Sequence, residues 1–218
     1  MNVIAIDGPC GSGKGTISSI LSKRLNYIYI DTGAMYRALT FFVINNNISL
    51  DDELSIIDAC LNIDISFSKD NKVLLNGVDI SKEIRSQEVT DCVSIVSSIK
   101  KVREIMVSQQ RKIAQNNNVV MEGRDITTVV FPDAKYKFYL DASVDVRAKR
   151  RFLQNKENNI DIAYEKILES IKKRDYLDCN REVGALTRTN DQIYIDTTSL
   201  TILEVVDKIV AIVNKKDV

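Results

Sequence analysis

The most informative segment of the chain reads Val3-Ile4-Ala5-Ile6-Asp7, directly followed by Gly8-Pro9-Cys10-Gly11-Ser12-Gly13-Lys14-Gly15-Thr16. The first part is a short apolar run typical of a buried strand, and apolar residues at helical spacing come after the second part. A glycine-rich turn between a strand and a helix is the setting of a phosphate-binding loop. Its glycines let successive backbone N–H groups face one anion, while Lys14 adds a positive charge. We therefore predict that residues 8–16 bind a nucleoside triphosphate.

The end of this loop distinguishes it from other phosphate-binding loops. Lys14 is followed by Gly15 and then Thr16, an ending that resembles nucleoside monophosphate kinases more than GTPases or motor ATPases. A switch GTPase also needs Asp-x-x-Gly, and no glycine of this chain has an aspartate three residues before it. Residues 214–217 fit Asn-Lys-x-Asp, but they lie in a charged tail with no strand before them, so we interpret this match as coincidental.

Composition and charge exclude several classes of protein. The 218 residues are 44% apolar and 28% charged, as in ordinary globular proteins. Thirty basic residues balance thirty acidic ones, whereas a nucleic-acid coat or a membrane-surface binder is normally basic. No apolar run approaches the roughly 20 residues of a membrane span. We therefore expect small-molecule partners, with neither nucleic acid nor membrane among them, and a monomer.

The absence of histidine restricts the chemistry more than any other feature of the composition. Ser–His and Cys–His nucleophile pairs and histidine-ligated metals are excluded, so the reaction must use carboxylates, lysine, arginine and backbone dipoles. The four cysteines, Cys10, Cys60, Cys92 and Cys179, are widely spaced. This spacing favours neither a disulfide framework nor a zinc site, and it indicates a cytoplasmic protein.

Short strand-like runs alternate with helical segments along most of the chain. The runs are residues 3–7, 27–31, 119–121, 137–141 and 192–196. Helices are expected at about 34–45, 100–115 and 143–154, and after a capping box at 201–204. This alternation predicts an α/β fold with a five-stranded parallel sheet that is covered by helices on both faces.

Residues 61–89 have a different pattern. Apolar and polar residues alternate around Ile65, and the run Lys72-Val73-Leu74-Leu75 leads into Asn76-Gly77, a strong hairpin signal. We predict a small antiparallel insertion here, carried on a core domain of residues 1–60 and 90–218.

Arginines follow the ends of two predicted strands, the edge at which ligands bind in open α/β sheets. Arg37 lies one turn into the helix that follows Asp31-Thr32-Gly33-Ala34-Met35-Tyr36, and its planar fork suits a phosphate. The alternative is a solvated surface arginine. Arg124 and Asp125 follow the strand that ends at about 121, and they form either a substrate site or a local ion pair.

A third charged group lies farther along the chain. Arg174, Asp178 and Arg181 follow one another at four- and three-residue steps, so on a helix they share one face. They form either part of a site or a solvated charge ladder. Phosphoryl transfer needs charge neutralisation and positioning more than a nucleophilic side chain, which suits a chain rich in arginine and without histidine.

Together these motifs resemble bacterial cytidylate kinases over essentially the whole chain. The motifs are residues 6–16, residues 31–37, Gly123-Arg124-Asp125-Ile126 with residues 128–134, Arg147 with Arg150-Arg151, and Ile195-Asp196-Thr197-Thr198. The resemblance implies an α/β P-loop kinase that transfers the γ-phosphoryl group of ATP, with Mg²⁺, to CMP or dCMP. It also implies that residues 61–89 form the acceptor domain and that a short arginine-rich lid lies at about 147–160.

The resemblance further implies roles for individual residues. Acceptor-phosphate ligands are expected at Arg37, Arg124 and Arg181, cytosine ligands at Ser94, Arg103 and Asp125, sugar ligands at Arg174 and Asp178, and further substrate contacts at Thr32 and Tyr36. The residues expected to act on the transferring group are Lys14, Arg124, Arg150, Arg151 and Arg181. Thr16 and Asp31 are the candidate magnesium ligands, directly or through water, although Asp31 is equally explained as a cap of the following turn.

Three positions depart from the family pattern. Cys10 stands where the family usually has serine, Glu122 replaces an aspartate, and Thr127 replaces a glycine, which strains the turn if a positive φ is needed there. Two alternatives to the cytidylate kinase interpretation remain open. One is a P-loop kinase for UMP or another small acceptor; a hydroxyl acceptor would need a general base, for which Asp31 is the only obvious candidate. The other is a nucleotide-switch regulator.

Overall fold

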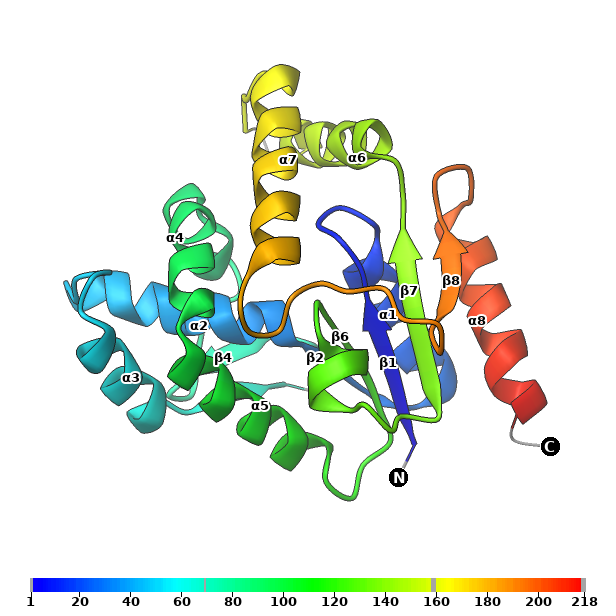
Figure 1. The fold of residues 1–218 in the computed structure, drawn as a ribbon, viewed down its shortest axis with the longest axis horizontal. Coiled ribbons are helices and arrows are strands. Elements are labelled where there is room, and N and C mark those ends of the chain that lie inside the picture. The colour runs from blue at the N-terminus through cyan, green and yellow to red at the C-terminus, as the bar shows by residue number, and fades with distance from the viewer. Residues whose placement is uncertain (1, 69, 158–159, 217–218) are drawn as a thin grey trace.

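A parallel β-sheet forms the centre of the molecule. The structure, a computed structural model, describes residues 2–68, 70–157 and 160–216. Within these residues the sheet has five strands in the order β2-β6-β1-β7-β8, all parallel (Figure 1). The strands are β1 (Val3–Asp7), β2 (Ile28–Asp31), β6 (Val119–Gly123), β7 (Tyr136–Asp141) and β8 (Ile193–Asp196). This confirms the predicted fold class and strand positions.

The sheet is buried on both faces, as the continuous apolar runs of its strands predict. In β1, Val3 and Ala5 pack into the larger core, and Ile4 and Ile6 pack into the core on the opposite face. This division follows from the strand geometry, in which successive side chains point to opposite sides.

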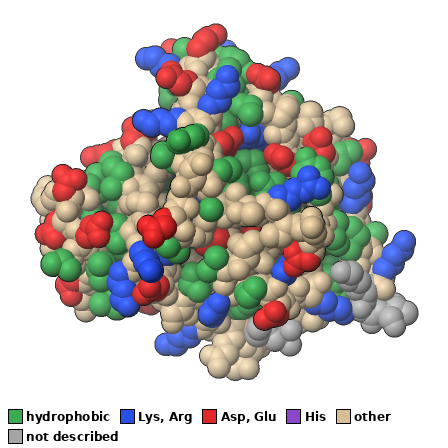
Figure 2. Space-filling model, viewed as in Figure 1, with side chains coloured by type: hydrophobic (Ala, Val, Ile, Leu, Met, Phe, Trp, Pro, Cys, Tyr) green, Lys and Arg blue, Asp and Glu red, His purple; other side chains and the backbone are tan. Residues whose placement is uncertain are grey.

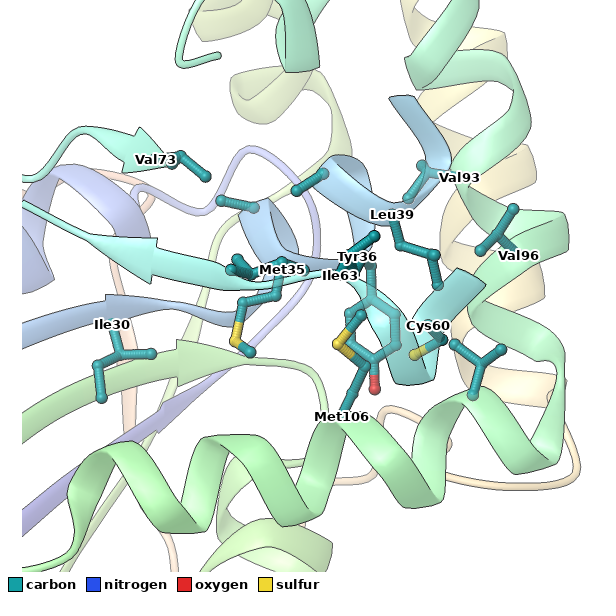
Figure 3. Close-up of a cluster of buried hydrophobic side chains, with 14 of the residues drawn as sticks. Ile30, Met35, Tyr36, Leu39, Cys60, Ile63, Val73, Val93, Val96 and Met106 are labelled. Atoms are coloured by element: carbon teal, nitrogen blue, oxygen red, sulfur yellow. The ribbon is translucent and has the colours of Figure 1, made fainter. Parts of the chain in front are cut away.

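Different helices cover the two faces. The larger core packs against α2 (Thr32–Asn45), α3 (Glu53–Asn62), α4 (Gln87–Ser98) and α5 (Lys100–Ala114). The opposite core packs against α1 (Lys14–Leu25) and α8 (Ile202–Lys216). Figure 3 shows Tyr36 and Leu39 of α2 among Cys60 of α3, Val96 of α4 and Met106 of α5, all of them buried. The predicted capping box begins α8, because Thr201 and Glu204 exchange hydrogen bonds.

A three-stranded antiparallel sheet is carried on the larger core. Its strands are β3 (Ile65–Phe67), β4 (Val73–Leu75) and β5 (Val78–Asp79), in that order. Asn76 and Gly77, with φ of 50° and 80°, form the turn of the predicted hairpin. A short 3-10 helix, η1 (Glu83–Arg85), leads into α4, so the predicted boundary at residue 89 falls inside that helix.

Two helices lie beyond the carboxyl ends of the parallel strands (Figure 1). They are α6 (Val144–Glu157) and α7 (Tyr164–Asn180), which pack together through Ala148, Ile167 and Ile171. Residues 158 and 159 of the expected lid, and residue 217 of the Asn-Lys-x-Asp match, lie outside the described residues. No helix in the described ranges is long and apolar enough to cross a membrane.

Candidate active site

The phosphate-binding loop joins β1 to α1. Gly8 takes a φ of 150°, and a Cβ there would lie 2.0 Å from the carbonyl oxygen of Leu140. Gly13 takes a φ of 91° as the N-cap of α1, and it offers no side chain to the first-turn N–H groups. Those N–H groups have no partner within the helix, and they are therefore able to bind an anion.

Lys14 lies at the centre of the loop. Its side chain is folded back, and Nζ donates a hydrogen bond to the carbonyl oxygen of Pro9 at 2.8 Å. Burial, helped by the positive charge of Arg124, lowers the Lys14 pKa to about 8. The buried carboxyl of Glu122, at the end of β6, favours the charged lysine, while burial and the charge of Asp31 raise the Glu122 pKa to about 7.

Three further loop residues, Cys10, Ser12 and Thr16, differ in their burial and in the groups around them. Burial opposes ionisation of the Cys10 thiol, but nearby positive charges, first Arg174 and then Arg124, lower its pKa to about 7. Ser12 is fully buried, and its hydroxyl is without a hydrogen-bond partner in the described part of the chain. Thr16 is exposed and lines the cavity with its neighbours.

The described residues allow only a magnesium site that has few protein ligands. Among the described residues no group of three or more histidine, cysteine, aspartate or glutamate side chains could hold a metal ion. Mg²⁺ commonly uses one or two protein ligands together with substrate phosphates and water. The Thr16 hydroxyl and the Asp31 carboxylate fit that pattern, although Oδ1 of Asp31 already accepts from the Ala34 N–H at 2.9 Å as the N-cap of α2.

The first turns of α2 carry the acceptor motif. The Thr32 hydroxyl donates to the carbonyl oxygen of Glu122 at 2.8 Å, which joins α2 to the end of β6. Arg37 donates from Nη1 to the Thr90 hydroxyl at 2.9 Å and to the Ile84 carbonyl at 3.3 Å. Burial lowers its pKa to about 10, so the guanidinium remains charged at neutral pH.

Arg103, Asp125 and Tyr36 form a buried group at one end of the site. Nη2 of Arg103 pairs with Oδ2 of Asp125, and both side chains are almost fully buried. Nη1 of Arg103 donates to the Ser97 carbonyl at 3.0 Å. The guanidinium also lies 5.3 Å from the centre of the Tyr36 ring. These contacts place the cation and the carboxylate side by side with fixed orientations.

Asp178 of α7 connects the other arginines. Its Oδ2 accepts from Nε of Arg124 at 2.7 Å, and its Oδ1 accepts from Nη2 of Arg181 at 2.5 Å. Arg174 lies farther away, with Nε 4.0 Å from Oδ2. Burial raises the pKa of the Asp178 carboxyl, but the three arginines outweigh it and lower that pKa. The predicted helical charge group is therefore an ion-paired cluster that lines the cavity, and it is not a solvated ladder.

One cavity of about 1240 Å³ brings most of the predicted residues together. The predicted residues that line it are Cys10, Gly11, Ser12, Gly13, Lys14, Gly15, Thr16, Asp31, Thr32, Tyr36, Arg37, Arg103, Arg124, Asp125, Arg150, Arg151, Arg174, Asp178 and Arg181. Gly8 and Pro9 shape the loop without lining the cavity. Ser94 lines an adjoining cavity of about 700 Å³, which shares Arg37, Arg151 and Arg174 with the first one.

The arginines of α6 are placed differently from one another. Arg147 is buried and bonds the carbonyl oxygens of Cys10 and Ala142 and the carboxylate of Asp175. Arg150 donates to the hydroxyl and the carbonyl of Thr197, and Arg151 donates to Gln154 at 3.0 Å. Arg147 therefore holds the phosphate-binding loop, whereas Arg150 and Arg151 face the cavity.

Some lining residues were missed from the sequence. They include Tyr29, Asn71, Arg85, Ser97, Glu122 and Thr197. Glu122 could have been found, because it lies one residue before the end of β6, the strand next to β1, and directly precedes Gly123-Arg124-Asp125. Nothing in the local sequence marks Asn71 or Arg85, which the small sheet and η1 bring to the cavity.

The expected strain at Thr127 is absent. Thr127 lies in a π-helical turn, η2 (Ile126–Val130), and it does not take a positive φ. Its hydroxyl donates to Oδ2 of Asp7 at 2.6 Å, so the larger side chain is accommodated by a hydrogen bond.

A phosphate-binding loop at the carboxyl edge of a parallel sheet, facing several arginines across one cavity, defines this chain as a P-loop phosphotransferase. The family model for cytidylate kinase matches residues 4–215. The chain belongs to the cytidylate kinase family, and it is an ATP-dependent nucleoside monophosphate kinase.

Sequence relatives agree with this assignment, and a solved structure shares the fold. A cytidylate kinase of Caldanaerobacter subterraneus subsp. tengcongensis is 50% identical over 212 residues, covering 97% of this chain and 94% of that protein. A cytidylate kinase of Clostridium botulinum is 48% identical over 212 residues, which are 97% of each chain. An uncharacterized protein from Eubacterium ventriosum superposes with a TM-score of 0.54 at 14% identity, covering 98% of this chain and 99% of that one. That structural likeness shows the fold alone.

Proposed function

We propose that this protein transfers the γ-phosphoryl group of ATP to the α-phosphate of CMP or dCMP, giving ADP and CDP or dCDP. The observation that carries the proposal is a single cavity lined by the Lys14 loop, by several arginines and by the Arg103–Asp125 pair. Those three parts suit a triphosphate, a second phosphate and a base. We further propose that the enzyme acts as a cytoplasmic monomer, consistent with its four free thiols.

The loop of residues 8–16 binds the donor phosphates in this proposal. Lys14 leaves the Pro9 carbonyl and contacts the phosphates, which a charged lysine favours over a neutral backbone oxygen. Mg²⁺ near Thr16 and Asp31 supplies positive charge that neutralises the phosphates. Arg150 and Arg151, which line the same cavity, add charge at the transferring group.

The acceptor phosphate binds between Arg37, Arg124 and Arg181. Asp178 already orients two of these guanidinium groups, so little rearrangement is needed to form a bidentate site. The nucleophile is an α-phosphate oxygen that is largely ionised at neutral pH. The reaction therefore needs no protein general base, in keeping with the absence of histidine.

Arg103 and Asp125 supply the base specificity. Oδ2 of Asp125 is held by Arg103, and we assign Oδ1 to the exocyclic amino group of cytosine. UMP carries a carbonyl oxygen at that position, which would face a buried carboxylate without a proton between them. A site built to pair a substrate N–H discriminates strongly against an analogue that lacks it. Ser94, in the adjoining cavity, and the sugar-facing pair Arg174 and Asp178 complete the proposed acceptor site.

Closure of the small antiparallel region and of the lid over the cavity excludes water in this proposal. Residues 61–89 serve as the acceptor domain, and residues of about 147–160 serve as the lid. An open site would allow water to take the phosphoryl group from ATP.

Replacing the acceptor arginines tests the proposal. Arg37→Ala and Arg181→Ala are each expected to raise the CMP KM or lower kcat by at least tenfold, because each removes a charged phosphate contact. ATP affinity, measured by titration, should change less than twofold. Arg24→Ala serves as the control, because it removes an exposed arginine that lies in the last turn of α1 and pairs with Asp207 of α8. Normal turnover by both acceptor variants would show that the acceptor assignment is wrong.

A further inference from the structure

We propose that Asp7, Thr127 and Gln192 are positioning residues, which fix Arg124 and Asp125 relative to the phosphate-binding loop through a buried chain of hydrogen bonds. The inference rests on the proposed function, because it assigns Asp125 to the base and Arg124 to the acceptor phosphate. All three side chains are buried, and none of them lines either cavity. They act on substrate only through the residues that they hold.

Asp7 is the link to the donor side. It is the last residue of β1 and directly precedes Gly8, and it lies beside Gly123 in the parallel register. Its Oδ1 accepts from the N–H of Ile126 at 2.8 Å, and its Oδ2 accepts from the N–H of Thr127 at 2.8 Å. One fully buried carboxylate therefore joins the start of the phosphate-binding loop to the backbone that follows Asp125.

Thr127 and Gln192 extend the link to a third segment. The Thr127 hydroxyl donates to Asp7 and accepts from Nε2 of Gln192 at 2.5 Å. Oε1 of Gln192 accepts from the N–H of Thr189 at 2.8 Å, and Nε2 also reaches the Thr187 carbonyl. The amide of Gln192 thus connects the turn after Asp125 to the backbone of residues 187–189.

The chain just before residues 187–189 covers the Arg103–Asp125 pair, which we assign to the base. A Cβ on Gly184 would lie 2.3 Å from Oδ2 of Asp125 and 2.4 Å from Nη2 of Arg103, so the backbone there is in direct contact with both groups. The Leu186 N–H donates to the carbonyl of Asp178 at 2.8 Å. The Arg103–Asp125 pair is therefore held between η2 and residues 184–189, and Thr127 and Gln192 bridge these two segments.

A hydrogen-bond chain in this place has a functional consequence. Phosphoryl transfer depends on in-line alignment of donor and acceptor, and a misplacement of about 1 Å can cost roughly a hundredfold in rate. Thr127 stands where the family resemblance leads one to expect glycine, which has no hydroxyl. The Asp7–Thr127–Gln192 chain is therefore a feature of this sequence's own residues.

Removal of the Thr127 hydroxyl tests the proposal. Thr127→Val keeps the shape of the side chain but leaves the Gln192 amide with only its longer contact to the Thr187 carbonyl, and Asp7 with one donor fewer. The expected result is a CMP KM raised about tenfold, a kcat/KM ratio of CMP to UMP lowered at least fivefold, and an ATP KM within twofold of the wild type. Thr127→Ser restores the hydroxyl and should return both acceptor parameters to within twofold. Gln192→Met, which removes the amide, should give a smaller change in the same direction.

Thr40→Val is the matched control. Thr40 is equally buried, and its hydroxyl donates within its own helix to the Tyr36 carbonyl at 2.8 Å. Thr40→Val is expected to lower only the urea midpoint. If Thr127→Val and Gln192→Met do the same, while the CMP KM and the CMP-to-UMP ratio stay unchanged, the positioning role is wrong. A wild type that releases no ADP with CMP overturns the proposed function and this inference together. If the wild type is active and the variants keep its kinetic constants, this inference alone is overturned.

Discussion

Cys10 brings an ionisable thiol into a loop where the family resemblance leads one to expect a hydroxyl. Its side chain lines both cavities, and its carbonyl is bonded by Arg147. The surrounding positive charges overcome the effect of burial and bring its pKa to about 7. The other cysteines differ, because burial raises the pKa of Cys60, Cys92 and Cys179. Cys10 is therefore the thiol most ionised at neutral pH.

We predict that iodoacetamide inactivates the enzyme through Cys10. The inactivation rate should rise severalfold between pH 6 and pH 8, because the thiolate is the nucleophile and its fraction grows as the pH passes the pKa of about 7. Saturating ATP should slow the reaction, since it occupies the same loop. The measurement is residual activity against time at each pH.

Cys10→Ser is the control for this experiment. The variant should remain active, because serine can replace the thiol in the loop, and it should resist inactivation. If Cys10→Ser lost activity to iodoacetamide as fast as the wild type, the reactive thiol would be another one.

At the scale of elements, Arg147 connects α6, α7 and the phosphate-binding loop. The guanidinium donates to the Ala142 carbonyl at 2.9 Å and to the Cys10 carbonyl at 3.1 Å, and Nη2 lies 2.7 Å from Oδ2 of Asp175. The side chain is only 4% exposed, so these contacts are shielded from water. Arg147 is therefore one of the side chains that hold the α6–α7 pair over the site, together with Arg150 and Asp178.

We predict that Arg147→Met lowers the free energy of unfolding by about 2 kcal/mol, because buried hydrogen bonds of a charged group are lost and Asp175 is left without its cation. The ATP KM should rise as well, since the Cys10 carbonyl loses its anchor. Urea unfolding and initial rates measure the two effects. Lys149→Met, on the exposed side of the same helix, should change stability by less than about 0.5 kcal/mol. Equal stability of both variants would contradict the anchoring role.

The elements that follow from local sequence could be predicted, and those created by tertiary contacts could not. The strands of the parallel sheet and the Asn76-Gly77 hairpin were predicted because apolar runs and turn residues are local signals. The π-helical turn η2 was not, because its run of β-branched residues favours a strand. In the structure the carboxylate of Asp7, 119 residues away from Ile126, binds the N–H groups of that turn.

Among the site residues, too, those in local sequence motifs could be predicted, and those brought in by tertiary contacts could not. The loop of residues 8–16 and the arginines at strand ends are recognisable because their motifs are continuous in sequence. Asn71 and Arg85 were missed because they come to the cavity from the small sheet and η1. Asn71 also contacts Ser19 of α1 at 3.4 Å, a contact between residues 52 positions apart. Ser94 was expected in the same site, but it lines the adjoining cavity.

The whole molecule has equal numbers of basic and acidic residues, but basic residues outnumber acidic ones around the cavity. Lys, Arg, Asp and Glu side chains are interspersed over the face shown in Figure 2, consistent with thirty residues of each sign. The cavity, in contrast, is lined among the described residues by Lys14 and eight arginines against five acidic residues. A site of this composition suits the several phosphate charges of two nucleotides, and the cytosine assignment then depends on one buried carboxylate, Asp125.

The most direct test of the central claim is a coupled ADP-release assay with ATP and Mg²⁺ against CMP, dCMP, UMP, AMP and GMP in parallel. We predict that CMP and dCMP exceed UMP at least tenfold in kcat/KM, which corresponds to about 1.4 kcal/mol of transition-state discrimination. Equal rates with UMP and CMP would contradict the role of Arg103 and Asp125 in reading cytosine. The absence of ADP release with every acceptor would contradict phosphoryl transfer itself.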